Sequence, residues 1–127
     1  MSINKAIVIG NVGKMEARET DHGPVCNLRV ATSRKWKDKR TGEKREETDW
    51  HNVVAWRRQA EFAAEWVTVG RLLFVEGRMQ TREYTDRDGN TRERTEIVAS
   101  DLRLLGSRAD EGQRDRRNEP TIAGTGT

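Results

Sequence analysis

The sequence predicts an all-β fold, a five-stranded barrel with one helix between the third and fourth strands. Three observations support this fold: five stretches with β-branched or alternating apolar residues, turn signals that separate them, and one stretch with helical spacing. At 127 residues the chain is long enough for one domain with its own core. Because hydrophobic residues make up 33% of the sequence and charged residues 35%, we expect a lean core beneath a heavily charged surface.

Three strands are expected in the first half of the chain, at residues 3–12, 25–36 and 48–56. β-Branched residues fill the first strand, and Gly13 bends or ends it. In the second strand Cys26, Leu28 and Val30 share one face, which we expect to be buried. Residues 37–46 are charged around a central Thr-Gly pair, so they predict a long hairpin loop. The second and third strands would then form a projecting basic arm.

Helical spacing begins at residue 58 and continues to residue 69, before Gly70. Four apolar side chains recur there at three- and four-residue intervals and are expected in the core: Phe62, Ala63, Trp66 and Val67. Ala and Glu residues between them favour a helix, and a glycine directly after the last turn is a common helix end. The stretch therefore predicts one amphipathic helix.

Two further strands are expected at residues 72–84 and 92–105. In the first of them Leu73, Val75 and Met79 are expected to face inward, and Gly77 invites a bulge. The Asp-Gly pair at residues 88–89 is a strong signal for a tight hairpin between the two strands. We expect residues 107–127, which are polar and nearly free of core-forming side chains, to be a disordered tail. The predicted domain is residues 1–106.

This order of elements is that of an OB-fold, a small Greek-key barrel that binds oligonucleotides or oligosaccharides across one face. Other small barrels share the same order of strands, so side chains have to distinguish them. No apolar run approaches the roughly 20 residues that cross a bilayer, and the N-terminus lacks the layout of a signal peptide. Cys26 with His22 and His51 cannot supply the usual four zinc ligands. We expect a cytoplasmic protein without membrane contact, metal or cofactor.

Basic and aromatic residues occur together along the predicted strands. Residues 29–45 contain eight basic and two acidic residues, which favours a polyanion as partner, although a solvated charged loop would show the same composition. Four aromatic residues fall on the predicted strands: Trp36, Trp50, Trp56 and Tyr84. All but Trp50 have Lys or Arg within two residues in the sequence. Flat rings stack on unpaired bases with little sequence preference, and cations meet the phosphates. The pattern indicates binding of single-stranded nucleic acid.

Several segments, in order and over about residues 3 to 105, resemble the bacterial single-stranded DNA-binding proteins (the SSB family). They are Asn4 to Asn11 (NKAIVIGN), Ala31-Thr32-Ser33 before Trp36, Thr48 to Val54 (TDWHNVV), Glu76-Gly77, and Thr81 to Asp86 (TREYTD) with Gly89. The resemblance implies an OB-fold that assembles as a homotetramer and wraps single-stranded DNA without catalysis. It also implies a role in DNA protection during replication, recombination and repair, close to the nucleoid.

The resemblance also implies roles for individual residues. Trp36, Trp50, Trp56 and Tyr84 fall where the family stacks bases, although phenylalanine is more usual at Trp56 and tryptophan at Tyr84. Basic residues expected to contact DNA are Lys5, Arg34, Lys35, Arg58, Arg82 and Arg92. His51 matches a histidine that supports the subunit interface. The family's acidic tip with a terminal phenylalanine has no counterpart in residues 120–127, so we expect no partner docking through it.

Two other classes of function use residues of these kinds. A different OB-fold module, such as a primosome accessory protein or an RNA chaperone, would use the same rings and cations, so RNA stays open as the ligand. An enzyme is disfavoured. The glycines at residues 10–13 lack the remainder of a phosphate-binding loop, Asp49 and His51 have no nucleophile beside them, and the acidic residues 46–49 are typical of a solvated turn.

Overall fold

The computed structural model describes residues 1–106. Five strands and one helix follow one another: β1 (Ala6–Thr20), β2 (Gly23–Lys37), β3 (Lys44–Trp56), α1 (Arg58–Trp66), β4 (Leu72–Thr85) and β5 (Thr91–Leu104). This order confirms the predicted all-β fold with one helix between the third and fourth strands. The predicted tail at residues 107–127 lies outside the described residues.

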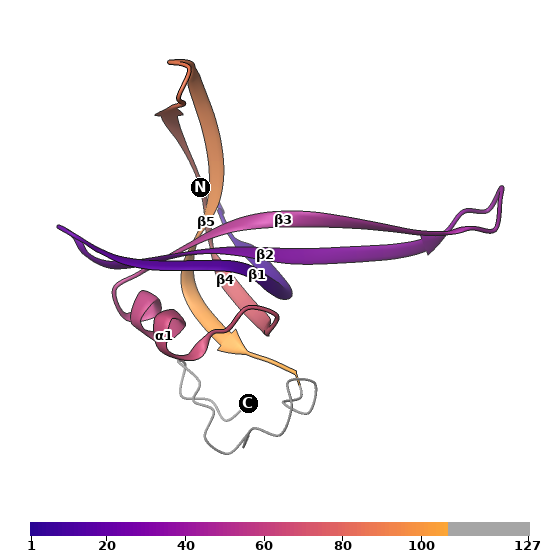
Figure 1. The fold of residues 1–127 in the computed structure, drawn as a ribbon, viewed down its shortest axis with the longest axis horizontal. Coiled ribbons are helices and arrows are strands. Elements are labelled where there is room, and N and C mark those ends of the chain that lie inside the picture. Colours follow the sequence, from indigo (N-terminus) through magenta and orange to yellow (C-terminus); the bar gives the residue numbers. More distant parts are fainter. Residues whose placement is uncertain (107–127) are drawn as a thin grey trace.

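The strands close into a barrel in the order β1, β2, β3, β5, β4, which confirms the OB-fold (Figure 1). β1 pairs with two strands: its first half pairs with β4 and its second half with β2, both antiparallel. The barrel closes where β3 meets β5 in parallel, with Val53 opposite Ile97 and Val54 opposite Val98. A closed barrel leaves no open sheet edge around its core.

Glycines allow the strands to cross closely at the barrel corners. A Cβ atom on Gly10 would lie 2.2 Å from the carbonyl oxygen of Ala31, and one on Gly77 would lie 2.1 Å from that of Val98. Only glycine fits at such close backbone approaches. At Gly13 the register of β1 shifts, so this residue bends the strand, which then continues to Thr20.

The core lies inside the barrel and beneath α1. The predicted inward residues Cys26, Leu28 and Val30 are buried, as are Leu73 and Val75 on β4. α1 packs against β2, β3, β5 and β1 and contributes Ala60, Phe62 and Ala63 to the core. Aliphatic side chains, chiefly valine, leucine and alanine, therefore fill the barrel.

The helix differs from the prediction in two respects. It ends at Trp66, before the predicted end at residue 69, and Val67 leaves it with extended backbone while its side chain stays buried. Trp66 is 37% exposed, so the expectation that it belongs to the core was wrong. The helix has only nine residues, so its apolar stripe is short, and Trp66 is its last residue. No helix within residues 1–106 is long and apolar enough to span a membrane.

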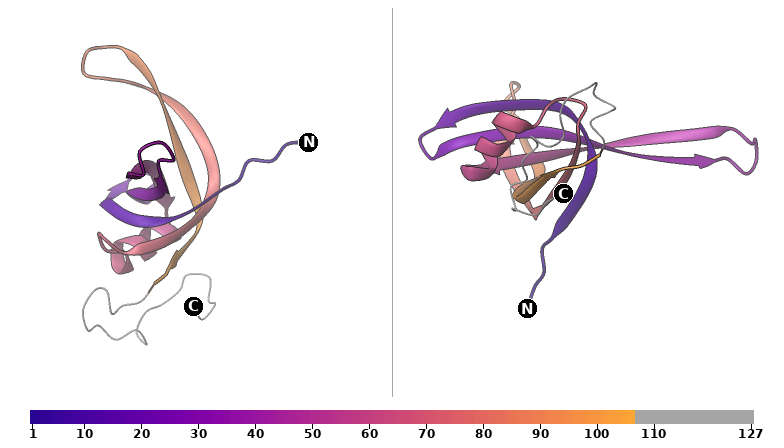
Figure 2. Two further views of the ribbon diagram at one scale, coloured as in Figure 1. Left: turned by 90° about the vertical axis from the view of Figure 1, so that its right-hand side faces the viewer. Right: turned by 90° about the horizontal axis from the view of Figure 1, so that it is seen from below.

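Two hairpins leave the barrel in different directions (Figures 1 and 2). The β2–β3 hairpin is the predicted arm, and its strands stay paired as far as Lys37 and Lys44. The β4–β5 hairpin projects from the barrel beyond Gly77, and residues 78–85 of β4 are all exposed. Met79 belongs to this projecting part and is 50% exposed, so its predicted inward position was wrong. Met79 alternates in step with the buried residues Leu73 and Val75, but it lies beyond the end of the barrel.

Candidate nucleic-acid interface

The four predicted stacking residues all lie on strands and are exposed to similar extents: Trp50 48%, Trp36 46%, Tyr84 42% and Trp56 37%. By contrast the core contains the ring of Phe62, which is 8% exposed. Trp66 matches Trp56 in exposure but lies on α1. Exposure alone therefore does not mark an interface, and the surroundings of each ring have to be considered.

Trp50 is held by the bend in β1. A Cβ atom on Gly13 would lie 2.3 Å from Cζ3 of the Trp50 ring, so the indole packs directly on the glycine backbone. The guanidinium of Arg29 stands over the same ring, 5.0 Å from its centre. The bulge that displaces Gly13 thus makes room for an indole that is supported by backbone and remains half exposed.

Trp36 lies near the end of the arm. Its ring carries the guanidinium of Arg34 at 5.6 Å, and Lys35 lies beside it in a cavity of about 560 Å³. The other residues that line this cavity are Lys37, Lys44, Arg45 and Glu46. An indole among five cations suits a base with its flanking phosphates.

Acidic residues of β3 and of the loop before it offset part of the arm's positive charge. Glu47 lies opposite Arg34 and forms an ion pair at 2.6 Å, and this hydrogen bond raises the pKa of Arg34. Arg45 lies within ion-pair distance of both Asp38 and Glu43. These pairs are well exposed, so each contributes little to stability and leaves the cation available to a phosphate.

Tyr84 lies on the projecting β4–β5 hairpin, directly opposite Arg92. The Arg92 guanidinium donates a hydrogen bond of 2.9 Å to Asp86, and this bond lowers the pKa of the Asp86 carboxyl. Asp86 also accepts backbone N–H bonds from residues 88 and 90, which fixes the turn. Arg92 is thereby held beside the tyrosine.

Arg82 differs from the other predicted cations because its acidic partner is buried. It donates a hydrogen bond of 2.8 Å to Glu96, which is only 4% exposed, and its pKa is raised as a result. Arg94 shares the same carboxylate at 3.6 Å. A buried carboxylate without a cation is strongly unfavourable, so Arg82 is more firmly fixed than Arg34 or Arg92.

The remaining predicted residues lie elsewhere on the barrel. Lys5 forms an exposed ion pair with Glu76 at 3.4 Å, and Arg58 begins α1. His51 is half-buried, and its Nε2 lies 2.9 Å from the Thr32 hydroxyl. Lys5, Trp50 and His51 line one shallow cavity of about 450 Å³.

The structure groups the predicted residues into three clusters. Trp36, Arg34 and Lys35 are on the arm, Lys5, Trp50 and His51 are on the barrel, and Tyr84, Arg82 and Arg92 are on the β4–β5 hairpin. Trp56 and Arg58 lie apart from these, where β3 leads into α1.

Sequence reasoning missed Gly13, which supports the Trp50 ring, and four basic residues that line one cavity: Lys14, Arg18, Arg29 and Arg94. In the sequence Arg29 is one member of a basic run, and Lys14 is only the residue that follows Gly13. Lys14 and Arg29 are register partners, which becomes visible only once β1 and β2 are aligned across the bulge.

Nothing in the described residues suggests metal binding or thiol chemistry at this surface. No group of three or more His, Cys, Asp and Glu side chains within residues 1–106 could hold a metal ion. Cys26 is buried in the barrel, and burial raises the pKa of its thiol to about 11.

Comparisons with known proteins place this chain in a family. Residues 3–105 match the model of the family described as the single-strand binding protein family. A single-stranded DNA-binding protein of Rhizobium meliloti (strain 1021) is 44% identical over 118 residues, which cover 87% of this chain and 68% of that protein. One from Neisseria meningitidis serogroup A is 44% identical over 110 residues, which cover 85% of this chain and 63% of that protein. The chain thus spans about two thirds of the length of these relatives.

Two solved structures have a similar fold. The Plasmodium falciparum SSB in complex with ssDNA superimposes with a TM-score of 0.73 at 29% identity, covering 84% of this chain and 97% of that one. A small single-stranded DNA-binding protein from Streptomyces coelicolor gives a TM-score of 0.65 at 25% identity, covering 83% of this chain and 96% of that one. The barrel, its exposed rings and the match over residues 3–105 lead to one conclusion: the chain belongs to the single-strand binding protein family.

Proposed function

We propose that this chain binds single-stranded DNA without sequence preference and without catalysis. The observation that carries the proposal is the exposure of Trp36, Trp50, Trp56 and Tyr84, each on a strand and most of them beside a cation. A single strand presents unpaired bases to such rings, whereas a duplex hides them. Stacking contributes about 1–3 kcal/mol per base and tolerates every base, so it gives affinity without sequence reading.

Phosphates are met by the six basic residues expected from the sequence: Lys5, Arg34, Lys35, Arg58, Arg82 and Arg92. Three of these, Lys5, Arg34 and Arg92, form exposed ion pairs within the chain. Exposed pairs contribute only about 0–1 kcal/mol each, so a phosphate can replace the carboxylate at little cost. Each phosphate neutralised adds about −0.7 to the slope of log affinity against log salt.

The experiment is a competition between defined strands. A labelled oligo(dT) is bound first, and unlabelled oligo(dT), duplex DNA or poly(U) is then added at equal nucleotide concentration. The proposal expects displacement by oligo(dT) and little by the duplex. Equal displacement by the duplex would contradict stacking, and equal displacement by poly(U) would contradict a preference for DNA. Strand cleavage in the presence of Mg²⁺ would contradict the non-enzymatic assignment.

We also propose that the protein acts as a homo-oligomer, a tetramer, with His51 near a subunit contact. Ile7, Ile9 and Met79 support this, because each is at least half exposed in the single chain. Exposed apolar side chains that cluster are typical of protein interfaces. His51, Ile7 and Met79 line one shallow cavity, so the apolar surface reaches the histidine. A light-scattering mass equal to that of one chain would contradict the proposal.

The proposed cellular role is to protect single-stranded DNA during replication, recombination and repair, in the cytoplasm near the nucleoid. This role follows from sequence-independent binding, because these processes all expose single strands of arbitrary sequence. A measurement that bears on it is protection of oligo(dT) from a single-strand nuclease at saturating protein.

A further inference from the structure

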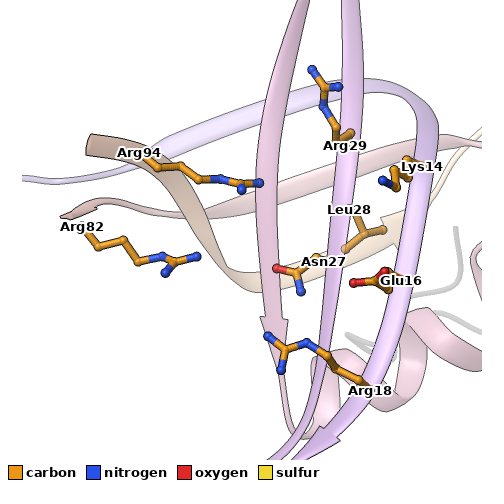
Figure 3. Close-up of a pocket in the computed structure, with 8 residues that line it drawn as sticks. All are labelled: Lys14, Glu16, Arg18, Asn27, Leu28, Arg29, Arg82 and Arg94. Atoms are coloured by element: carbon orange, nitrogen blue, oxygen red, sulfur yellow. The ribbon is translucent and has the colours of Figure 1, made fainter. Parts of the chain in front are cut away.

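A basic groove lies between the β1–β2 strands and the β4–β5 hairpin (Figure 3). Its volume is about 280 Å³, and its lining residues are Lys14, Glu16, Arg18, Asn27, Leu28, Arg29, Arg82 and Arg94. In Figure 3 the side chains of Arg82 and Arg94 extend from the hairpin towards the strands that carry the others. Cations from four strands thus converge on one space.

The charge of the groove is not balanced within the described chain. Lys14, Arg18 and Arg29 form no ion pair with any acidic residue among residues 1–106. Arg82 and Arg94 share a single carboxylate, that of Glu96. Five cations therefore stand against two carboxylates, Glu16 and Glu96.

The register places two of the unpaired cations directly opposite each other. Lys14 on β1 is the partner of Arg29 on β2. Like charges at opposed positions of an antiparallel pair repel and destabilise the sheet. The free protein thus retains an unfavourable pair that an anion between the two side chains would relieve.

The lining also indicates which part of a nucleic acid fits. No aromatic side chain lines the groove, so it offers no surface for stacking a base. Arg29, which lines the groove, stands over the Trp50 ring at 5.0 Å from its centre. A strand with one base on Trp50 would therefore have its backbone at Arg29, at the edge of the groove.

We propose that this groove is a subsite for the sugar-phosphate backbone of the bound strand, in which Lys14 and Arg29 together contact two phosphates. The inference rests on the proposed binding of single-stranded DNA and adds a defined path for the strand between Trp50 and the β4–β5 hairpin. Arg82 and Arg94 complete the positive wall on the hairpin side.

The test measures affinity for a labelled oligo(dT) between 50 and 200 mM salt. The variant Lys14→Gln with Arg29→Gln removes two groove cations, and the control Arg78→Gln with Arg87→Gln removes two exposed cations that do not line the groove. Loss of two phosphate contacts makes the slope of log affinity against log salt shallower by about 1.4. The ratio of wild-type affinity to that of the groove variant should therefore fall about sevenfold between 50 and 200 mM salt. The control should keep the wild-type slope.

The outcomes separate the two proposals. If the wild type does not bind oligo(dT), the proposed function is wrong. If the wild type binds and both variants keep its slope, the proposed function stands and the groove is not a phosphate subsite. If the groove variant loses more thermal stability than the lost contact of Arg29 with Trp50 explains, Lys14 and Arg29 are structural and the inference is overturned, because removal of opposed like charges by itself should leave stability unchanged or increased.

An abasic strand distinguishes phosphates from bases as the groove's ligand. An oligomer of deoxyribose phosphate without bases cannot stack, but it keeps every phosphate. The affinity ratio of wild type to groove variant should be the same for this strand as for oligo(dT). A ratio close to one for the abasic strand alone would show that the groove takes bases, which contradicts the inference.

Discussion

Replacement of Trp50 by alanine tests the stacking surface most closely, because the chain contains a matched control. Trp50 is 48% exposed on β3, and Trp66 is 37% exposed on α1. Both variants delete an indole that solvent already reaches. Only Trp50 lies among cations of the candidate interface, so only Trp50→Ala should weaken DNA binding.

The size of the effect follows from the surroundings of the ring. Stacking of one base contributes about 1–3 kcal/mol. The base has to share the ring with the Arg29 guanidinium, which stands 5.0 Å from its centre, and an exposed cation–π contact is worth about 0.5–1 kcal/mol. A net loss of about 1–2 kcal/mol is therefore expected, or roughly 5- to 30-fold in affinity.

The assay is anisotropy of a labelled oligo(dT) at fixed salt, with thermal unfolding measured in parallel. Trp50→Phe keeps a flat ring and should retain most of the affinity. Trp66→Ala should bind within about twofold of wild type, and its loss of stability should be smaller than the roughly 3–5 kcal/mol of a buried tryptophan. Equal loss of affinity in Trp50→Ala and Trp66→Ala would refute stacking at Trp50.

Three further predictions concern residues around the interface and in the core. Gly13→Ala places a Cβ 2.3 Å from the Trp50 ring, so the ring must move; affinity for oligo(dT) should fall while Trp66 fluorescence is unaffected, and unchanged affinity would show that the position of the ring is unimportant. Glu96→Gln frees the charges of Arg82 and Arg94, so binding should tighten and its salt slope steepen, whereas weaker binding by a folded variant would contradict this. The pKa of Cys26 is raised to about 11, so the unfolded chain loses the thiol proton first, and the contribution of this thiol to the free energy of unfolding should be constant below about pH 9 and fall towards pH 11. Denaturant titrations of Cys26→Ala should show a smaller fall over that range, and an identical fall would exclude the thiol as a cause.

The fold could be predicted because its signals are local. The alternation of Cys26, Leu28 and Val30, the helical spacing after residue 58 and the Asp-Gly pair at 88–89 each depend on near neighbours in the sequence. The predictions of burial failed where the local sequence pattern does not determine the position of a residue in the fold. Met79 keeps the parity of the buried residues of β4, but it lies past the end of the barrel.

The residue types of the candidate site could be predicted from the sequence, but the ion pairs among them could not. Rings beside cations can be identified from the sequence, and Trp36, Trp50, Trp56 and Tyr84 are indeed exposed. The sequence does not show which acid faces which base. Strand register decides that Arg34 faces Glu47 and that Lys14 faces Arg29. Between β1 and β2 a bulge before Lys14 shifts this register.

The central claim is that exposed rings on the strands receive the bases of a single strand. Its most direct test is intrinsic tryptophan fluorescence during titration with oligo(dT), followed by the same titration with the duplex of that sequence. Strong quenching by the single strand, little by the duplex, and residual emission from Trp66 are expected. Unchanged emission on saturation with oligo(dT) would contradict the account.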